Sequence, residues 1–424
     1  MDSGNFRPVM QSSTLLKIIE LHVLSYLEEK ISFDIRQFGF KNGCSTTDAC
    51  LMLKETVNKY IKRKGRAYAT FIDLSKAFDR VNHFMLGQQL LDRGTPPDLV
   101  LLIMRYLRNQ SARVCWNGHK GHYVFLERGV RQGGILSPFL FKLYIDHLLT
   151  QIANANIGCK LGILRINVIA YADDIVLLAD SMDNISKLYK LLKDGLQKLQ
   201  LNMNKTKSKC MVFQKSGVIN ETSIKLDSDT LDIVTNYKYL GHMVNSQLLD
   251  TADIRNQLNS FYAKFNCIFR NFNNVSVETF MLLFNSYCLP DYGLAIWNIS
   301  NIIGSHVFKS FETGFSNSLK KIIGVPLYSS SHITAEICGS LLFIHHLSII
   351  QARYMKRLAN VNNSIINLSF YYLQSGFLFN SVFNHFKDKY NVNVWSNDLD
   401  TLKARVSYVQ KHEERSRTCY FYGI

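Results

Sequence analysis

Three aspartates, at two points of the chain, could share one chemistry. Asp173 and Asp174 are adjacent within "RINVIAYADDIVLLAD" (165–180), and Asp73 ends the apolar run "AYATFID" (67–73). Burying ionised carboxylates costs free energy unless each one is paired or coordinated. Carboxylate oxygens suit Mg²⁺ or Mn²⁺, and two such ions can activate a hydroxyl and stabilise a departing pyrophosphate. The three acids therefore predict a site for two divalent ions.

A simple turn is the alternative interpretation of the adjacent pair, because aspartate tolerates turn geometry well. Apolar residues flank Asp173 and Asp174 on both sides and occupy both parities of the sequence. That pattern is typical of strands buried on both faces. It predicts a buried hairpin with the two acids at its tip, and from these residues alone the turn and the metal site both stay open.

Helical spacing and capping residues define the elements that must position these acids. Helices are predicted at 12–31, 44–65, 83–92, 97–108, 137–153 and 183–200. Strands are predicted at 67–73, 208–213 and 237–244, with hairpins at 112–129 and 165–180. Ser137 is the expected N-cap of the helix that Pro138 begins. Long helical patterns dominate after about residue 246, so we expect a domain boundary there, and the last thirty residues are not assigned.

The composition favours a polyanionic partner. Lys and Arg number 49 against 33 Asp and Glu, for a formal charge of +16. A charge of this size favours contact with nucleic acid, although solubility alone is the alternative explanation. The nine cysteines show no C-x-x-C pair, so we expect reduced thiols in an intracellular protein. No uncharged run is long enough to predict a membrane span.

Seven sequence blocks in order resemble the reverse transcriptases of non-LTR (LINE-like) retrotransposons. They are "NFRPV" (5–9), "QFGFKNGCST" (37–46), "FIDLSKAFDRVNH" (71–83), "GVRQGGILSPFLF" (129–141), "YADD" (171–174), "GLQKLQLNMNKTK" (195–207) and "YLGHMV" (239–244). The segment "SYCLPDYGLAIWN" (286–298) resembles the downstream thumb region of the same elements. One such block is common by chance, but this ordered series is specific.

The resemblance implies an α+β fold of the right-hand polymerase type, with fingers, palm and thumb. The palm would contain an antiparallel sheet, and a mostly helical C-terminal region would follow. The implied fingers lie mainly in 1–66 and 92–130, the palm mainly in 67–91 and 131–245, the helical thumb in 246–330 and the helical C-terminal region in 331–424.

The family's catalytic residues carry over onto matching positions. Asp73, Asp173 and Asp174 would be the palm carboxylates that hold two Mg²⁺ or Mn²⁺ ions, with the backbone carbonyl of Leu74 as a further ligand. Phe78 lies where the family has a steric gate against the 2′-hydroxyl of a ribonucleotide. A packed core phenylalanine is the alternative interpretation, and the two are compatible because a gate must be held rigidly.

Further nucleotide-binding candidates follow from the same resemblance. Arg131, Gln132 and Gly133 match the family's segment near the nascent base pair, where Gly lets the backbone approach closely. Lys205 and Lys207 both lie where the family places a lysine near the outgoing pyrophosphate. Such a lysine can act as a general acid, and the choice between them is open.

Triphosphate and duplex contacts are expected from basic side chains. Arg7 and Lys41, in the fingers blocks, are candidates for the triphosphate. Thumb residues expected along the product duplex are Lys264, Arg270, Lys309, Lys320 and Lys321.

The implied activity is RNA-directed DNA synthesis from a 3′-hydroxyl. Its partners would be an RNA template, a DNA primer and dNTPs, without a membrane, and its location the nucleus. An endonuclease would be supplied elsewhere in a longer element protein, of which this chain would be the polymerase fragment. Two alternatives are a related lineage such as an intron-encoded enzyme, and a catalytically inactive nucleic-acid-binding remnant. The intact acids favour the polymerase over the remnant.

Overall fold

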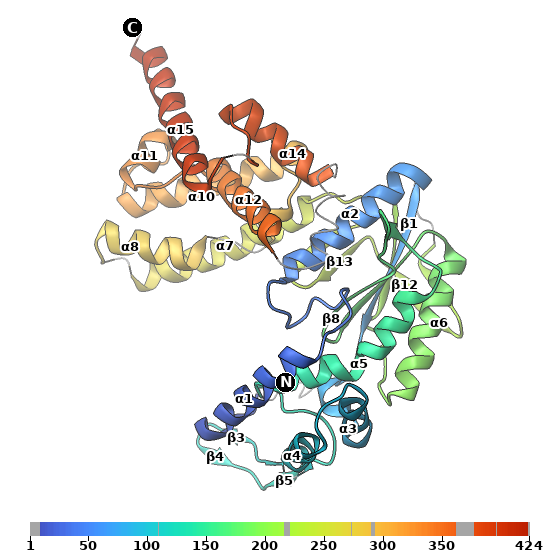
Figure 1. Cartoon of the computed structure of the whole chain (residues 1–424). Helices are drawn as coiled ribbons and strands as arrows, with labels where there is room; N and C mark the ends of the chain where they lie inside the picture. Colours follow the sequence, from blue (N-terminus) through green and yellow to red (C-terminus); the bar gives the residue numbers. More distant parts are fainter. Residues whose placement is uncertain are drawn as a thin grey trace. The chain divides into compact units, whose positions relative to one another are not determined.

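The computed structural model describes residues 9–108, 110–215, 221–272, 274–289, 293–361, 377–395 and 397–422 (Figure 1). The chain forms two compact units, which are treated separately below. Met1–Ala49 and Tyr60–Val234 make the first, here called the sheet unit, and Cys50–Lys59 and Thr235–Ile424 make the second, the helical unit. Helix α2 (Thr46–Lys64) contributes residues to both units.

A six-stranded sheet forms the centre of the sheet unit, in the order β11-β12-β10-β1-β9-β8. The strands are β1 (Arg66–Asp73), β8 (Val168–Tyr171), β9 (Asp174–Ala179), β10 (Lys209–Gln214), β11 (Ser223–Leu226) and β12 (Asp229–Ile233). Every pairing is antiparallel except that of β10 with β12. The expected α+β class with a largely antiparallel sheet is therefore confirmed, with one parallel pair added.

Helices cover this sheet and fix its edges (Figure 1). Helix α5 (Ser137–Asn154) packs on β8, and α6 (Met182–Lys198) packs on β1, β9 and β11. Helix α3 (His83–Asp92) packs on α4 (Pro97–Arg108) and on α5, while α1 (Thr14–Lys30) precedes them in the chain. The apolar faces of these helices and the middle of the sheet share one core, which includes Tyr144 and Tyr189.

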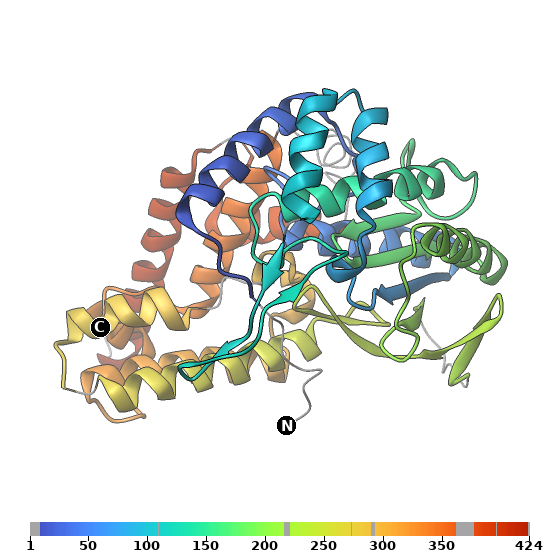
Figure 2. The ribbon, with the colours of Figure 1, turned by 90° about the horizontal axis from the view of Figure 1, so that it is seen from below.

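Short strand pairs complete the sheet unit. The pairs are β2 (Ser111–Ala112) with β5 (Val124–Phe125), β3 (Cys115–Trp116) with β4 (His119–Lys120), and β6 (Lys160–Leu161) with β7 (Leu164–Arg165). Strands β2–β5 make a narrow two-stranded projection, turquoise in Figure 2. It corresponds to the hairpin predicted at 112–129.

The helical unit contains a short hairpin followed by helices. Its elements are β13 (Asn236–Tyr239), β14 (His242–Asn245), α7 (Thr251–Asn271), α8 (Val277–Leu283), the π-helix Phe284–Cys288, the 3₁₀ turn Leu294–Ile296, α9 (Ile299–Ile302), α10 (His306–Ile323), α11 (Ser331–Ile337), α12 (Phe343–Asn360), α14 (Phe377–His385), the π-helix Phe386–Tyr390 and α15 (Leu399–Tyr422). Stacked and edge-on aromatic rings fill its core, with Phe261 against Phe284, Phe311 and Phe315. No helix in the described ranges meets the length and apolarity needed to cross a membrane.

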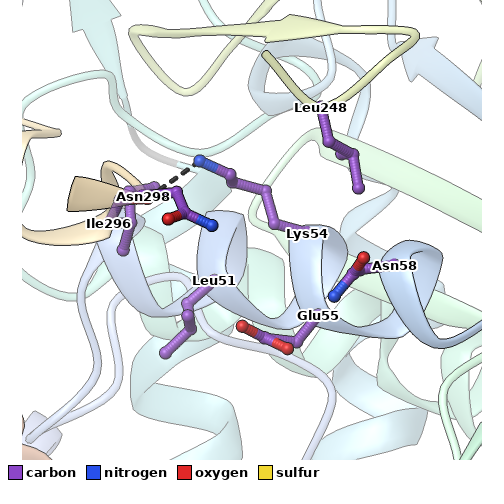
Figure 3. A pocket seen from close by; sticks show the side chains of 7 residues that line it. All are labelled: Leu51, Lys54, Glu55, Asn58, Leu248, Ile296 and Asn298. Atoms are coloured by element: carbon purple, nitrogen blue, oxygen red, sulfur yellow. Dashed lines mark hydrogen bonds between the residues drawn. The ribbon is translucent and has the colours of Figure 1, made fainter. Parts of the chain in front are cut away.

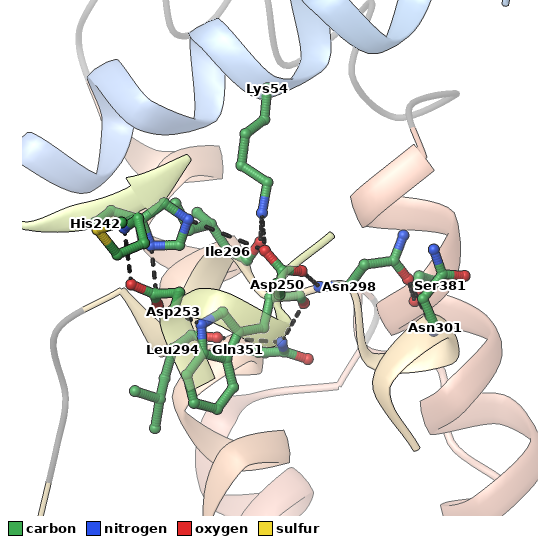
Figure 4. Close-up of polar contacts among 12 residues, drawn as sticks. Lys54, His242, Asp250, Asp253, Leu294, Ile296, Asn298, Asn301, Gln351 and Ser381 are labelled. Atoms are coloured by element: carbon green, nitrogen blue, oxygen red, sulfur yellow. Dashed lines mark hydrogen bonds and ion pairs between the residues drawn. The ribbon is translucent and has the colours of Figure 1, made fainter. Parts of the chain in front are cut away.

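A buried polar network lies at the start of α7 (Figure 4). The Asp253 carboxylate accepts hydrogen bonds from the Trp297 indole (2.7 Å) and the Met243 amide (2.9 Å), and His242 Nδ1 lies 3.0 Å away. Asp250 accepts from Lys54 Nζ (2.6 Å) and from a backbone amide at position 298 (2.8 Å). Burial alone would raise the pKa of Asp253, but these neighbours, His242 first among them, lower it.

Several local predictions are confirmed at the residues that made them. Helix α2 begins after a capping box between Ser45 and Asp48 and ends at Gly65, whose φ is +76°. Such a box satisfies two backbone amides at once, and Gly adopts the left-handed end conformation without strain. The predicted helices at 83–92 and 97–108 have the observed bounds of α3 and α4.

Other expectations were wrong in an informative way. The strand predicted at 237–244 is a hairpin, because Leu240 and Gly241 both have positive φ (+46° and +84°), as a tight two-residue turn requires. Lys320 points inward, with 5% of its surface exposed, and donates to the Leu327 carbonyl. It is therefore not a surface contact for a duplex. The predicted bounds of fingers, palm, thumb and C-terminal region stay predictions, since the two compact units, which divide after Val234, are not the same kind of division.

Candidate active site

Strand register sets two of the three predicted acids opposite each other. Asp73 is the last residue of β1, and it pairs with Asp174, the first residue of β9. Directly opposed residues of antiparallel strands have Cβ atoms about 4.5–5.5 Å apart on the same face. Both side chains are half-buried at this end of the sheet. Carboxylates separated by 101 positions in the sequence therefore face one site.

The third acid, Asp173, lies in the turn between β8 and β9, where Tyr171 pairs with Asp174. The residue before it, Ala172, has φ +55°, a conformation that costs a non-glycine residue about 1–3 kcal/mol and that clusters at functional sites. No three His, Cys, Asp or Glu side chains in the described ranges are gathered closely enough to hold a metal ion. The structure thus brings Asp73 and Asp174 together but does not complete the predicted three-carboxylate cluster.

Residues 36–40 support the strained turn from the edge of β8. The Phe38 amide donates to the Ala170 carbonyl (2.8 Å), and the Ala170 amide donates to the Arg36 carbonyl (3.0 Å). The side-chain oxygen of Gln37, a residue that is 1% exposed, accepts from the amides of Ala172 and Gly39, both at 3.2 Å. These hydrogen bonds hold the turn in its uncommon backbone conformation.

Gly39 is needed because its backbone touches the turn. A Cβ at this position would lie 2.5 Å from the Ala172 nitrogen and 2.9 Å from the Tyr171 carbonyl carbon. Backbone atoms cannot move aside as flexible side chains can, so any larger residue must displace the hairpin. Gln37 and Gly39 are site residues that the sequence interpretation missed, although both lie in a quoted block, "QFGFKNGCST".

The opposite side of Asp73 is fixed by the segment 202–208. The Asn204 amide donates to the Asp73 carbonyl (2.8 Å), and the Ser75 amide donates to the Asn202 carbonyl (2.8 Å), on either side of an antiparallel bridge between Leu74 and Met203. This bridge uses the neighbouring peptide groups. Within the described ranges no hydrogen bond engages the Leu74 carbonyl, the predicted backbone ligand.

The ring and backbone of Phe78 are held rigidly, as a steric gate requires. Its ring stacks on Phe141 with centroids 4.7 Å apart and planes 17° from parallel. Its carbonyl accepts from the Val130 amide (2.8 Å). Gly129 has φ +89°, and a Cβ there would lie 2.8 Å from the Phe78 carbonyl oxygen. The segments around residues 78 and 129 are therefore locked together.

The predicted nucleotide loop connects to the same segment. Gln132 Nε2 donates to Asp79 Oδ1 (2.9 Å), next to Phe78 in the chain, and the Gln132 carbonyl accepts from the Met10 amide (2.8 Å). Gly133 has φ +106° and would place a Cβ 2.9 Å from the Met10 carbonyl oxygen. The Arg131 guanidinium lies 4.9 Å from the Tyr106 ring centroid, a cation–π contact. Arg131, Gln132 and Gly133 thus belong to one loop, which contacts with neighbouring segments hold in place.

A buried glutamate replaces the helix cap expected at Ser137. Helix α5 begins at Ser137, one residue earlier than predicted. Glu20 Oε2 accepts from the amides of Ile135 (2.6 Å) and Leu136 (3.2 Å), just before the helix. Glu20 Oε1 accepts from the Tyr106 hydroxyl (2.8 Å). Burial and this carboxylate raise the pKa of Tyr106. A carboxylate from α1 therefore satisfies amides that a local serine was expected to satisfy.

The two candidate lysines differ in their partners. Lys205 Nζ lies 2.5 Å from Asp229 Oδ1, and Lys193 Nζ lies 2.9 Å from Oδ2 of the same carboxylate. Burial would raise the pKa of Asp229, but hydrogen bonds from Lys193, Lys205 and Tyr189 lower it to about 2. The Lys207 side chain is exposed and makes no ion pair with the described part of the chain. Lys207 is thus the cation available for a phosphate.

Lys41, which follows the segment 36–40 in the chain, is half-buried. Its neighbour Lys142, on α5, donates to the Phe40 carbonyl (2.6 Å). Burial is the main cause that lowers the pKa of Lys142 to about 8, and the charge of Lys41 acts in the same direction. Lys142 is only 3% exposed, so of the two lysines Lys41 is the one accessible to an anionic ligand such as a triphosphate. Arg7, the other candidate, lies outside the described residues.

A hollow in the helical unit is separate from these residues (Figure 3). It is small, partly open to solvent, and lined by Leu51, Lys54, Glu55, Asn58, Leu248, Ile296 and Asn298. None of these is a predicted site residue. Its lysine is already bound to Asp250 and to the Ile296 carbonyl.

Comparisons with known proteins cover the same region of the chain. The family model described as "Reverse transcriptase (RNA-dependent DNA polymerase)" matches residues 2–244. The Pol polyprotein of the type-1 retrotransposable element R2 of Nasonia vitripennis is 31% identical over 261 residues, which are 58% of this chain and 25% of that protein. The RNA-directed DNA polymerase from mobile element jockey of Drosophila melanogaster is 24% identical over 86% of this chain and 40% of its own length.

Among solved structures, a telomerase from Candida tropicalis in complex with the TWJ fragment of telomeric RNA has a TM-score of 0.40 and 14% identity, over 86% of this chain and 57% of that one. The chain spans between a quarter and two fifths of the length of the two retroelement proteins.

Proposed function

The chain belongs to the reverse transcriptase family, and on this premise we propose that it is an RNA-directed DNA polymerase of the kind that non-LTR retrotransposons encode. The observation that carries the proposal is the register of β1 and β9, which sets Asp73 opposite Asp174. Close to Asp73 in the chain, Phe78 is joined through Asp79 to Gln132. Two opposed carboxylates near a tightly packed Phe78 ring and the loop of Gln132 suit nucleotidyl transfer.

Divalent cations, Mg²⁺ or Mn²⁺, fit this donor set because every candidate ligand is an oxygen. Asp73, Asp174 and Asp173 would hold two of them, together with the Leu74 carbonyl that the bridge to Met203 does not use. When bound, such ions activate a primer 3′-hydroxyl and stabilise the departing pyrophosphate. The remaining residues of the site act on the nucleotide and the strands.

Each of these residues has a role that its surroundings allow. Phe78, packed on Phe141, would exclude a ribose 2′-hydroxyl by its bulk. Gln132 would contact the nascent base pair through the amide that now bonds to Asp79. Lys207 would hold the pyrophosphate or protonate it as it leaves, whereas Lys205 is bound to Asp229.

The substrates and partners belong to the same proposal. The protein would copy an RNA template from a DNA primer, using dNTPs, as part of a longer element protein that contains an endonuclease elsewhere. It would act in the nucleus, where its target DNA is.

A primer-extension assay tests the proposal. The full chain with a primed RNA template, dNTPs and Mg²⁺ should extend the primer, and absence of extension with Mg²⁺ and with Mn²⁺ would contradict the function. Phe78→Ala should raise the ratio of ribonucleotide to deoxyribonucleotide incorporation by about ten-fold or more, since a steric contact is lost. A ratio is insensitive to partial unfolding. Phe84→Ala, which removes a ring that is 66% exposed on α3, is the matched control.

A further inference from the structure

Strands β2–β5, residues 111–125, form the narrow projection seen in Figure 2, and several of its large apolar side chains are exposed to solvent. The exposed fractions are 73% for Val114, 69% for Trp116, 61% for Tyr123, 61% for Val124 and 76% for Phe125. A two-stranded ribbon is marginally stable alone and gains nothing from such side chains in water. Clustered exposed apolar groups mark a binding surface.

Pairing defines what one face of this ribbon presents. The Arg113 guanidinium lies 4.9 Å from the Tyr123 ring centroid, so these two side chains share a face. On the side of this pair towards the base of the ribbon, Ser111 pairs with Phe125. On the side towards the tip, Cys115 pairs with Lys120. Because side chains alternate along extended strands, Phe125 lies on the same face as Tyr123 and Arg113. Lys120 lies nearer the tip, beyond a one-residue shift in the pairing.

The ribbon carries exposed basic side chains that form no ion pairs with described residues. Arg113, Lys120 and Arg128 are exposed, and none of them forms an ion pair with a described residue. Glu127 is the single acid between residues 111 and 128. Aromatic rings interleaved with cations are the chemistry that binds single-stranded nucleic acid, through base stacking and phosphate contacts. Protein interfaces, by contrast, are depleted in lysine at their centres.

The ribbon begins after helix α4 and ends at the nucleotide loop. At its base the Leu126 amide donates to the Gln110 carbonyl (2.9 Å). The chain then runs directly into Gly129, whose carbonyl accepts from His83 Nε2 (2.7 Å), and on to Gln132. A strand bound along the ribbon would therefore lead to the position proposed for the nascent base pair.

We propose that the ribbon binds the single-stranded RNA template, with bases stacked on Tyr123 and Phe125 and phosphates held by Arg113 and Lys120. The identity of the strand as template rests on the proposed function, but the binding itself does not. Stacking on an aromatic ring tolerates every base, so the contact guides the strand without reading its sequence.

Fluorescence anisotropy of a labelled, unstructured RNA oligonucleotide tests this with the full chain and no dNTPs. Replacing both rings, in Tyr123→Ala with Phe125→Ala, should weaken binding by about ten-fold or more. The conservative pair Tyr123→Phe with Phe125→Tyr should stay within about two-fold of the wild type, because both rings remain. Phe84→Ala, another exposed aromatic of the sheet unit, is the matched control and should bind normally.

Arg113→Gln with Lys120→Gln should reduce the slope of log Kd against log salt by about 2.

Three outcomes would overturn the proposal. In the first, the two-alanine variant binds RNA as the wild type does. In the second, that variant loses self-association in sedimentation velocity while RNA affinity is unchanged, which identifies a protein interface. In the third, it loses single-stranded DNA but keeps RNA. A wild type that binds RNA but extends no primer contradicts the proposed polymerase alone, so the two failures are distinguishable.

Discussion

Asp250 and Asp253 of the helical unit have surroundings opposite to those of Asp73 in the sheet unit. In the helical unit, Asp250 and Asp253 are 4% and 0% exposed, and both accept hydrogen bonds from the protein itself. In the sheet unit, Asp73 is half-buried opposite Asp174, and its carboxylate has no hydrogen bond or ion pair with a described residue. Acids that the fold compensates stabilise the fold, whereas an acid without internal donors is available to cations from outside.

The largest expected effect is on Asp73. Asp73→Asn should reduce the rate of primer extension by about 1000-fold or more, because the site loses a metal-binding oxygen and a negative charge. Its free energy of unfolding should change by no more than about 0.5 kcal/mol, since no internal partner is lost. Rapid-quench extension and urea unfolding measure the two quantities.

Asp232→Asn is the control for Asp73, because this acid lies on β12 of the same sheet with its side chain 67% exposed. It should extend primers normally. An Asp73→Asn protein that extended primers normally but unfolded more easily would show that Asp73 stabilises the fold and does not serve the reaction.

The second effect is on Asp253, where a substitution should lower stability and leave primer extension by the folded protein unchanged. Asp253→Asn should lower the free energy of unfolding by about 3 kcal/mol, because a buried partner of His242 and Trp297 loses its charge. Thermal and urea unfolding of the full chain measure the loss. Asp400→Asn, whose side chain is 91% exposed, is the control and should be neutral. Unchanged stability in Asp253→Asn would show that this network does not hold the helical unit together.

The third effect tests whether the acids of the sheet unit depend on the strained turn. Gly39→Ala places a methyl carbon 2.5 Å from the Ala172 nitrogen, so the hairpin that carries Asp173 and Asp174 must shift. Primer extension should fall by about ten-fold to a hundred-fold, as small displacements of reacting groups do. Gly87→Ala is matched, because its methyl group meets only the flexible Met104 side chain. Full activity in Gly39→Ala would mean that the hairpin tolerates movement.

The smallest effect concerns pH. The folded pKa of Asp229 is about 2, below its ordinary value of 3.8, so its ionised form stabilises the fold. That contribution is present above about pH 4 and is lost as the pH falls towards 2. Asp229→Asn should therefore cost about 1 kcal/mol at pH 7, a modest value because Lys205 is 61% exposed and solvent screens the pair.

Urea unfolding of the wild type and of Asp229→Asn between pH 7 and pH 3 measures this difference, which should shrink with acid. A constant difference would assign the effect to packing. Asp229 would then be a third kind of acid, buried without an electrostatic role.

Local patterns predicted the elements that carry the acids. The apolar parity around 165–180 identified a hairpin buried on both faces, and its strands are β8 and β9. Ser45 and Gly65 marked both ends of α2. These features depend on residues within a few positions of each other, so one sequence is enough to find them.

Contacts between distant residues could not be predicted in this way. Glu20 binds amides 115 and 116 residues away, and Gln37 binds an amide 135 residues away. Nothing local distinguishes Glu20 from a surface glutamate, and serine before proline made Ser137 the better local cap. Lys205 and Lys207 look alike in "NKTK", and the tertiary partner Asp229 separates them. The Asp73–Asp174 register likewise follows from sheet order, which no short pattern contains.

The long separation within the helical unit has a consequence during synthesis. Lys54 lies in the early segment 50–59 of that unit, and its partner Asp250 comes 196 residues later. At about 5–20 residues per second, a ribosome would make the two roughly 10 to 40 s apart. During that interval the middle of α2 has none of its later partners, so the helical unit completes its core only after residue 250 has been made.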